Sequence, residues 1–169
     1  MAEGENQTIM TTYRKARHAD VNAITAIMND NLDEYRQYRE YEANHNLPEK
    51  FTDMYVGQYL EIEDAPIFVA ETPTEDGPAI SGCIIALCES MLNPDLDQSE
   101  HLHITNLDVR SEFRRQGIGR ALVLAVEEWA RKRQFTAIFT EVYTRNQNAS
   151  ALFGPDGYVT VTESRRKLL

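Results

Sequence analysis

A short glycine-containing turn between a strand and a long helix constrains the fold of this chain more than any other stretch. Residues 101–109, HLHITNLDV, alternate in character as a strand does, and residues 114–119 read RRQGIG. Beyond the turn, apolar side chains recur at helical spacing over 117–134, at Ile118, Leu122, Ala125 and Trp129. These patterns predict a strand, a tight turn and a helix in direct succession.

The remaining segments extend this unit to a mixed α/β sheet. Helices are predicted after Asp20, onward over 29–41 in helical or near-helical form, and over 48–60 and 148–153. Further strands are predicted over 11–16, 67–71, 79–87 and 136–143 and from Tyr158 to the end. We therefore expect one α/β domain over 10–169, preceded by a flexible tail over 1–9.

Composition excludes several classes of protein. The chain has 169 residues, of which 42% are hydrophobic and 26% charged, as in a globular domain. No apolar run approaches the length of a membrane span, and a net charge of −10 argues against nonspecific nucleic-acid binding. No Cys/His spacing predicts a metal site. Cys83 and Cys88 lie five residues apart on one strand, so we expect buried thiols, no disulfide and a reducing, cytoplasmic location.

Charge is unevenly distributed along the chain. Residues 28–64 hold ten acidic and three basic residues, and five of the eight tyrosines lie between Tyr35 and Tyr59. Carboxylates and aromatic faces together favour a cationic ligand, although solvated helix faces and core tyrosines explain the same pattern. Residues 110–120 hold four arginines and one glutamate, so this part of the chain favours an anion.

The RRQGIG stretch is either a plain turn or an anion site. Gly117 and Gly119 leave the backbone open, and the first N–H groups of a helix have no partner within it. A phosphate or pyrophosphate fits such a helix start, and Arg114, Arg115 and Arg120 add positive charge. The stretch lacks the spacing of a P-loop or of a dinucleotide-binding turn.

Two motifs resemble those of the Gcn5-related N-acetyltransferase (GNAT) family. Arg114-x-x-Gly117-x-Gly119, between LDVRSEF and RALV, resembles the acetyl-CoA signature of that family. The stretch NQNASALFGPDGY resembles its second signature through Asn146, Ala149, Leu152, Phe153, Gly157 and Tyr158. The order of elements also matches the family fold, a mixed sheet with splayed central strands flanked by helices. The resemblance implies transfer of an acetyl group from acetyl-CoA to a primary amine.

The resemblance also implies roles for individual residues. The backbone of Arg115, Gln116, Gly117, Ile118, Gly119 and Arg120 would hold the pyrophosphate of CoA. Leu107 and Val109 fall where the family strand bulges and splays, so their backbone groups would bind the pantetheine arm. The Val109 N–H would polarise the thioester carbonyl, and Asn146 would bind the arm from the other strand. Phe153 occupies a CoA-contacting position at which many members have a tyrosine acid; Tyr143 or a water would replace that acid.

The acceptor amine must lose a proton before it attacks. His103, on one strand face with His101 and Thr105, is a candidate base, and Glu141 is a second. A half-exposed histidine and a structural glutamate are the competing interpretations. Glu34 and Tyr35 are the residues of the acidic segment expected to face the acceptor groove.

Direct transfer to a cationic amine in a ternary complex is therefore the predicted function. Candidate acceptors are a polyamine, an aminoglycoside, or a lysine or N-terminus of a peptide. A noncatalytic acyl-CoA-binding regulatory module is the alternative, and a nucleotide-phosphate binder is a weaker third. Neither cysteine is placed to carry the acyl group. A partner chain that completed the short C-terminal strand would give a homodimer.

Overall fold

A computed structural model describes residues 10–39, 48–88, 101–154 and 157–161. The predicted N-terminal tail over 1–9 lies outside these residues. Within the described part, no helix is both long and apolar enough to span a lipid bilayer.

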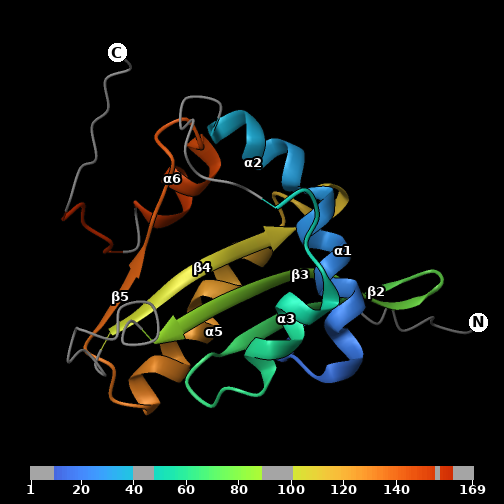
Figure 1. The fold of residues 1–169 in the computed structure, drawn as a ribbon, viewed down its shortest axis with the longest axis horizontal. Helices are drawn as coiled ribbons and strands as arrows, with labels where there is room; N and C mark the ends of the chain where they lie inside the picture. Colours follow the sequence, from blue (N-terminus) through green and yellow to red (C-terminus); the bar gives the residue numbers. More distant parts are fainter. Residues whose placement is uncertain (1–9, 40–47, 89–100, 155–156, 162–169) are drawn as a thin grey trace, which may run out of the picture.

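Five strands form one mixed sheet in the order β1-β2-β3-β4-β5 (Figure 1). Four of them pair antiparallel in chain order: β1 (Thr12–Lys15), β2 (Ile67–Thr74), β3 (Gly77–Cys88) and β4 (His101–Val109). The fifth, β5 (Ala137–Thr140), lies parallel to β4 and is reached through α5 (Ile118–Lys132). The mixed α/β architecture predicted from the sequence is confirmed.

Helices cover both faces of this sheet (Figure 1). On one face α1 (Val21–Asp30) and α3 (Asp53–Leu60) pack on inward side chains of β2 and β3, and α5 packs on the opposite face. The short α2 (Leu32–Arg39) follows α1 directly, and α6 (Gln147–Phe153) follows β5. Short 3-10 helices lie at His18–Asp20 and Ser111–Phe113. The site described below lies where α2, β4 and the start of α5 meet.

The strands β4 and β5 diverge in the middle of the sheet. Their pairing ends at Ile104 opposite Thr140, whereas β4 runs five residues further. At the same point the β3–β4 register slips, so that Ile85 pairs with Asn106 but the next β3 residue pairs with Ile104. Thr105 is therefore an extra residue in β4, and such a bulge bends the strand. The splayed central strands predicted from the sequence are present.

Several predicted boundaries shift in the structure. The helix expected over 48–60 begins only at Asp53, because Thr52 caps it by accepting a hydrogen bond from the Tyr55 N–H. Residues 158–161 are not in a strand. In α5, Val123, Val126 and Ala130 are buried with Ile118 and Leu122, whereas the predicted core residues Ala125 and Trp129 are half-buried.

The two cysteines agree with the prediction. Cys83 and Cys88 are both buried, and no disulfide joins them. Burial, with the charge of Asp108 nearby, raises the pKa of the Cys83 thiol well above its usual value. Cys83 is therefore held as a thiol and is a poor nucleophile.

Candidate functional site

The start of α5 presents backbone donors that precede the first hydrogen bond of the helix. Gly117 is the residue before the helix and has a φ of 81°, a left-handed conformation that favours glycine. The Ala121 N–H donates to the Gly117 carbonyl at 3.0 Å, so the amides of Ile118 and Gly119 precede the first helical hydrogen bond. No side chain caps this end, and its first turn holds no acidic residue. An anion is the ligand that such an end attracts.

The helix start lies against the splayed end of β4. A methyl group at Gly119 would lie 3.7 Å from Leu152 Cδ2 and 4.0 Å from side-chain carbons of Leu107 and Val109. The absence of a side chain at Gly119 thus keeps a narrow space open between α5, α6 and β4. The two motifs that the sequence predicted to act together meet at this space.

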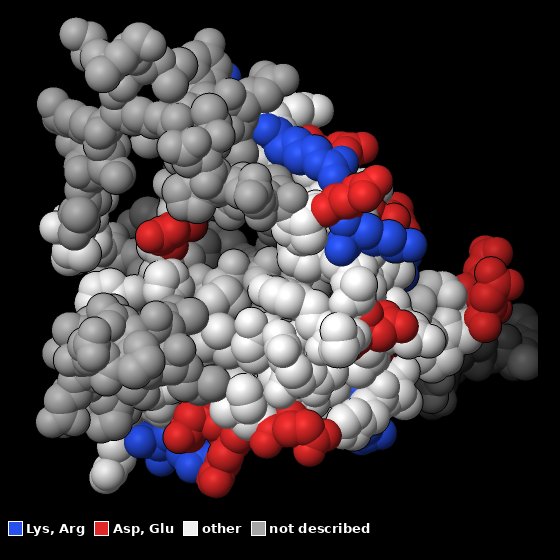
Figure 2. All heavy atoms as spheres, in the orientation of Figure 1, with Lys and Arg blue, Asp and Glu red and all other residues white. Residues whose placement is uncertain are grey.

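The backbone of β4 is oriented outward at the splay. The Arg110 N–H donates to the Ser81 carbonyl on β3 at 2.9 Å. Because backbone groups alternate in direction along a strand, those of Asp108 also face β3, whereas those of Leu107 and Val109 face the β5 side. No described residue of β5 pairs with β4 beyond Ile104. Figure 2, drawn in the orientation of Figure 1, shows a hollow in the surface over the gap between β4 and β5.

A buried carboxylate that the sequence did not nominate lies behind this edge. Asp108 is 1% exposed, and its Oδ1 accepts hydrogen bonds from Asn31 Nδ2 at 2.9 Å and from the Tyr35 hydroxyl at 3.0 Å. Its Oδ2 is buried and has no hydrogen-bond partner among the described residues. Burial raises the pKa of Asp108 to about 6, against the lowering effect of those two hydrogen bonds and of the Arg114 charge.

The predicted substrate residue Glu34 is paired with Arg114. The Arg114 guanidinium lies 2.9 Å from Glu34 Oε2, and it donates to Asn31 Oδ1 at 2.8 Å and to the Val109 carbonyl at 3.0 Å. Tyr38 donates to the other Glu34 oxygen at 2.6 Å. Burial alone would raise the pKa of Glu34, but the hydrogen bonds from Tyr38 and Arg114 outweigh it and lower that pKa.

This network fixes α2 to the end of β4. The side chain of Arg114 therefore points at α2. The sequence had predicted instead that it would add positive charge at the start of α5. The neighbouring Arg115 is exposed and reaches Asn148 Oδ1 at 3.5 Å, and the exposed Gln116 donates to the Glu112 carbonyl at 3.3 Å. Tyr35, the second predicted substrate residue, turns its hydroxyl toward the strand, 3.5 Å from the Leu107 carbonyl.

The two candidate bases lie on either side of the splay. His103 is half-buried and is opposite Leu87 on β3 and Phe139 on β5, where all three strands are still paired. Glu141 is exposed and follows directly after the end of β5. Asp108 directly precedes Val109, so both candidate bases are farther from Val109 along the chain than Asp108 is.

The second motif forms the wall of the site on the α6 side. Asn146 caps α6, since its Oδ1 accepts from the Ala149 N–H at 3.0 Å, and its own N–H donates to the Tyr143 carbonyl at 2.8 Å. Phe153 is 7% exposed and packs edge-to-face on Tyr158 at 5.0 Å between ring centres. Tyr143 is half-buried in the turn between β5 and α6.

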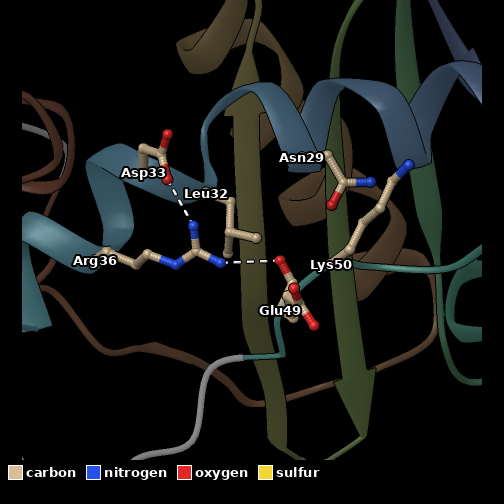
Figure 3. Close-up of a pocket in the computed structure, with 6 residues that line it drawn as sticks. All are labelled: Asn29, Leu32, Asp33, Arg36, Glu49 and Lys50. Atoms are coloured by element: carbon tan, nitrogen blue, oxygen red, sulfur yellow. Dashed lines mark hydrogen bonds and ion pairs between the residues drawn. The ribbon is translucent and has the colours of Figure 1, made fainter.

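A second hollow, of about 530 Å³, lies between the α1–α2 pair and the segment before α3. Figure 3 shows the Arg36 guanidinium between Asp33, which it contacts at 2.6 Å, and Glu49, to whose carbonyl it donates at 2.9 Å. Its lining residues are Asn29, Leu32, Asp33, Arg36, Glu49 and Lys50. These contacts hold Glu49 against α2 and so support the helix that carries Glu34 and Tyr35. The described residues contain no cluster able to hold a metal ion.

Known acetyltransferases resemble this chain both in sequence and in fold. A sequence model of the acetyltransferase (GNAT) family matches residues 22–157. The BH1408 protein from Bacillus halodurans shares the fold, with a TM-score of 0.76 and 20% identity over 94% of this chain and 99% of that one. Ribosomal-protein-alanine N-acetyltransferase from Brucella melitensis gives a TM-score of 0.66 and 25% identity over 86% of this chain and 83% of that one.

A curated relative matches over a shorter range. Thialysine N-epsilon-acetyltransferase from Caenorhabditis elegans is 35% identical over 65 residues. That match covers 38% of this chain and 41% of the relative's length.

Proposed function

Because the chain belongs to the GNAT family of acetyltransferases, we propose that it transfers an acetyl group from acetyl-CoA to a primary amine, directly and within a ternary complex. The observation that carries the proposal is the meeting of two features at one place. The amides of Ile118 and Gly119 at the start of α5 lie against the splayed end of β4, where the backbone groups of Leu107 and Val109 face the β5 side.

The pyrophosphate of CoA would bind at the start of α5. Residues 115–120 supply the backbone amides, including those of Gln116, Ile118 and Gly119, and Arg115 and Arg120 lie beside them. The helix end adds a partial positive charge of about half a unit. The pantetheine arm would then pass along Leu107 and Val109, with Asn146 on the opposite wall and Phe153 beneath it.

The Val109 N–H would stabilise the oxyanion that forms as the amine attacks. A fixed donor of this kind typically contributes about 3 kcal/mol to the transition state. Phe153 has no proton to give, so the departing CoA thiolate would receive one from Tyr143 or from water. The high pKa of the Cys83 thiol supports direct attack over an acyl-enzyme.

The acceptor would be a primary amine that carries positive charge in solution. The Caenorhabditis elegans relative is named for an ε-amine and the Brucella melitensis relative for the alanine of a ribosomal protein, so both names support an amine acceptor. His103 and Glu141 are the nominated bases. Glu34 contributes to the acceptor side through its pair with Arg114, and Tyr35 through its hydroxyl. A cytoplasmic location and a homodimer stay predictions.

Incubation with acetyl-CoA and a panel of amines tests the proposal. We expect free CoA thiol to appear only in the presence of an amine, and mass spectrometry to detect an acetylated amine. Because Phe153 replaces the usual acid, a noncatalytic acyl-CoA-binding module is the second candidate. CoA binding without turnover of any amine would favour that module.

A further inference from the structure

Asp108 is a buried carboxylate for which neither family motif provides a role. One of its oxygens accepts two hydrogen bonds, while the other is buried without a partner among the described residues. A buried polar atom left unpaired costs free energy, and in native proteins such atoms are few and mark catalytic groups, strain or the place of an ordered water. Packing alone therefore does not explain why a carboxylate is buried at position 108, whereas a catalytic role would.

Asp108 lies next to the proposed reacting centre. It directly precedes Val109, and its partner Tyr35 extends its hydroxyl to 3.5 Å from the Leu107 carbonyl, on the open edge of β4. The phenol thus lies between the buried carboxylate and the gap into which the thioester would be delivered. An amine that attacks a thioester beside Val109 would come close to this hydroxyl.

We propose that Tyr35 and Asp108 together accept the proton that the acceptor amine must lose. Tyr35 is the catalytic residue, because its hydroxyl would contact the amine, and Asp108 is a positioning residue that acts through it. This inference rests on the proposed acetyl transfer and names the group that activates its acceptor.

The acceptor nitrogen loses two protons in the proposed reaction, one before and one after its attack. The ammonium gives a proton to the Tyr35 oxygen while Tyr35 gives its own proton to Asp108 Oδ1, and the nitrogen keeps the electron pair. That pair attacks the thioester carbon, and the C–S bond breaks with its electrons on sulfur. The second nitrogen proton goes to the thiolate. Protonated Asp108 then returns its proton through Tyr35 to solvent when the products leave.

The charges around Asp108 suit this task. Tyr35 and Glu34 face it from α2, Arg114 from the segment before α5, and Cys83 from β3. Burial and the Asp108 charge raise the pKa of Tyr35 well above its usual value, so the phenol keeps a proton to relay. A carboxylate that titrates near pH 6 is a proton acceptor about 100-fold better than one of ordinary pKa and is still ionised at pH 7.

The same geometry disfavours His103 for this step. His103 lies where β4 is paired on both sides, before the bulge at Thr105. The Tyr35 hydroxyl lies beyond the bulge, near the Leu107 carbonyl on the open edge, with the Asp108 carboxylate behind it. Position relative to the splay thus separates the two candidates.

The test compares Asp108→Asn and Tyr35→Phe with the wild type. Asparagine keeps an oxygen for the hydrogen bonds from Asn31 and Tyr35 but cannot accept a proton. We expect each variant to lower kcat/KM for a lysine-like amine by about 100-fold or more at pH 7.5, the usual range for loss of a general base. The double variant should lose little more, and the affinity for CoA should stay within about twofold. Asp76→Asn, in the exposed β2–β3 turn, is the matched control and should keep wild-type turnover.

Two readouts separate proton transfer from a structural effect. In the wild type, kcat/KM for the lysine-like amine should bend downward below about pH 6. In both variants it should instead fall steadily, about tenfold per pH unit and with no break near pH 6, because only the neutral amine can then react. Hydroxylamine, which is largely neutral at pH 7, needs no base, so its acetylation should fall far less than that of the lysine-like amine. Equal losses for both acceptors, or unchanged turnover and pH profile in Asp108→Asn, would overturn the inference and leave the proposed transfer intact. A wild type that acetylates no amine would overturn both.

Discussion

Replacing Asp108 by asparagine should make the protein more stable above neutral pH. The carboxyl is 1% exposed, one of its oxygens has no partner in the described part of the chain, and burial raises its pKa from 3.8 to about 6. Since the folded-state pKa lies above the unfolded-state value, ionisation favours the unfolded chain, and its cost is present above pH 6 and lost as the pH falls toward 4. The shift of about two pKa units corresponds to about 3 kcal/mol at pH 7.5 and to less than about 1 kcal/mol at pH 4.

The asparagine variant escapes this pH-dependent cost. Its amide nitrogen would take the place of the unpaired oxygen and would itself lack a partner, at a cost of about 1–2 kcal/mol that is the same at every pH. We therefore expect its free energy of unfolding, relative to wild type, to improve by about 2–3 kcal/mol between pH 4 and pH 7.5, with a net gain of about 1–2 kcal/mol at the higher pH.

Urea denaturation of both proteins at the two pH values measures this difference directly. All other titrating groups are common to both chains, so their contributions cancel. Thermal unfolding should show the same sign, with the melting temperature at pH 7.5 raised by about 3–8 °C for a chain of this size. A difference in stability that does not change with pH would refute the reasoning, because it would mean that Asp108 titrates as it does in the unfolded chain.

Three further predictions concern the cofactor site and the proton path. Gly119→Ala should leave stability unchanged or raise it by about 0.5–1 kcal/mol, because alanine is a better helix former, yet lower CoA affinity at least about 10-fold by filling the space beside β4; denaturation and calorimetric titration check the two effects. His103→Ala should leave the pH–rate profile for amines of high pKa unchanged, because His103 lies where β4 is paired on both sides, and a loss of turnover confined to those amines would restore the imidazole as the base. Replacing both Cys83 and Cys88 by alanine should leave turnover largely intact, and complete loss in a folded, CoA-binding variant would contradict direct transfer.

The sheet and its main crossover could be predicted from periodicity alone. The β4 boundaries, 101–109, agree with the structure, and α5 differs from its predicted range by one or two residues at each end. Glycine at a left-handed φ and a strong apolar stripe make this unit locally determined. The strand predicted over 136–143 is shorter, Ala137–Thr140, because β4 bends away at its bulge and leaves the later residues without a partner.

The acceptor side of the site could not be predicted from the sequence, because it is formed by contacts between segments that are distant in the chain. A helix over 29–41 was predicted to continue from α1, but the structure separates α1 from α2 at Asn31, whose side chain bonds Asp108 and Arg114. Arg114 was expected at the pyrophosphate because it belongs to the same short motif as Gly117 and Gly119. Nothing in that motif indicates its pairing with Glu34. Asp108 itself was missed; a charged residue between two apolar ones, in a strand with helices on both faces, was the available signal.

Titration of CoA and of pantetheine into the protein tests the central claim most directly. If the amides at the start of α5 hold the diphosphate, CoA should bind at least about 100-fold more tightly than pantetheine, which lacks that group, since two or more charge-assisted hydrogen bonds would be lost. Salt should weaken the binding of CoA far more than that of pantetheine. Equal affinities for the two ligands, or no measurable binding of CoA, would contradict the account.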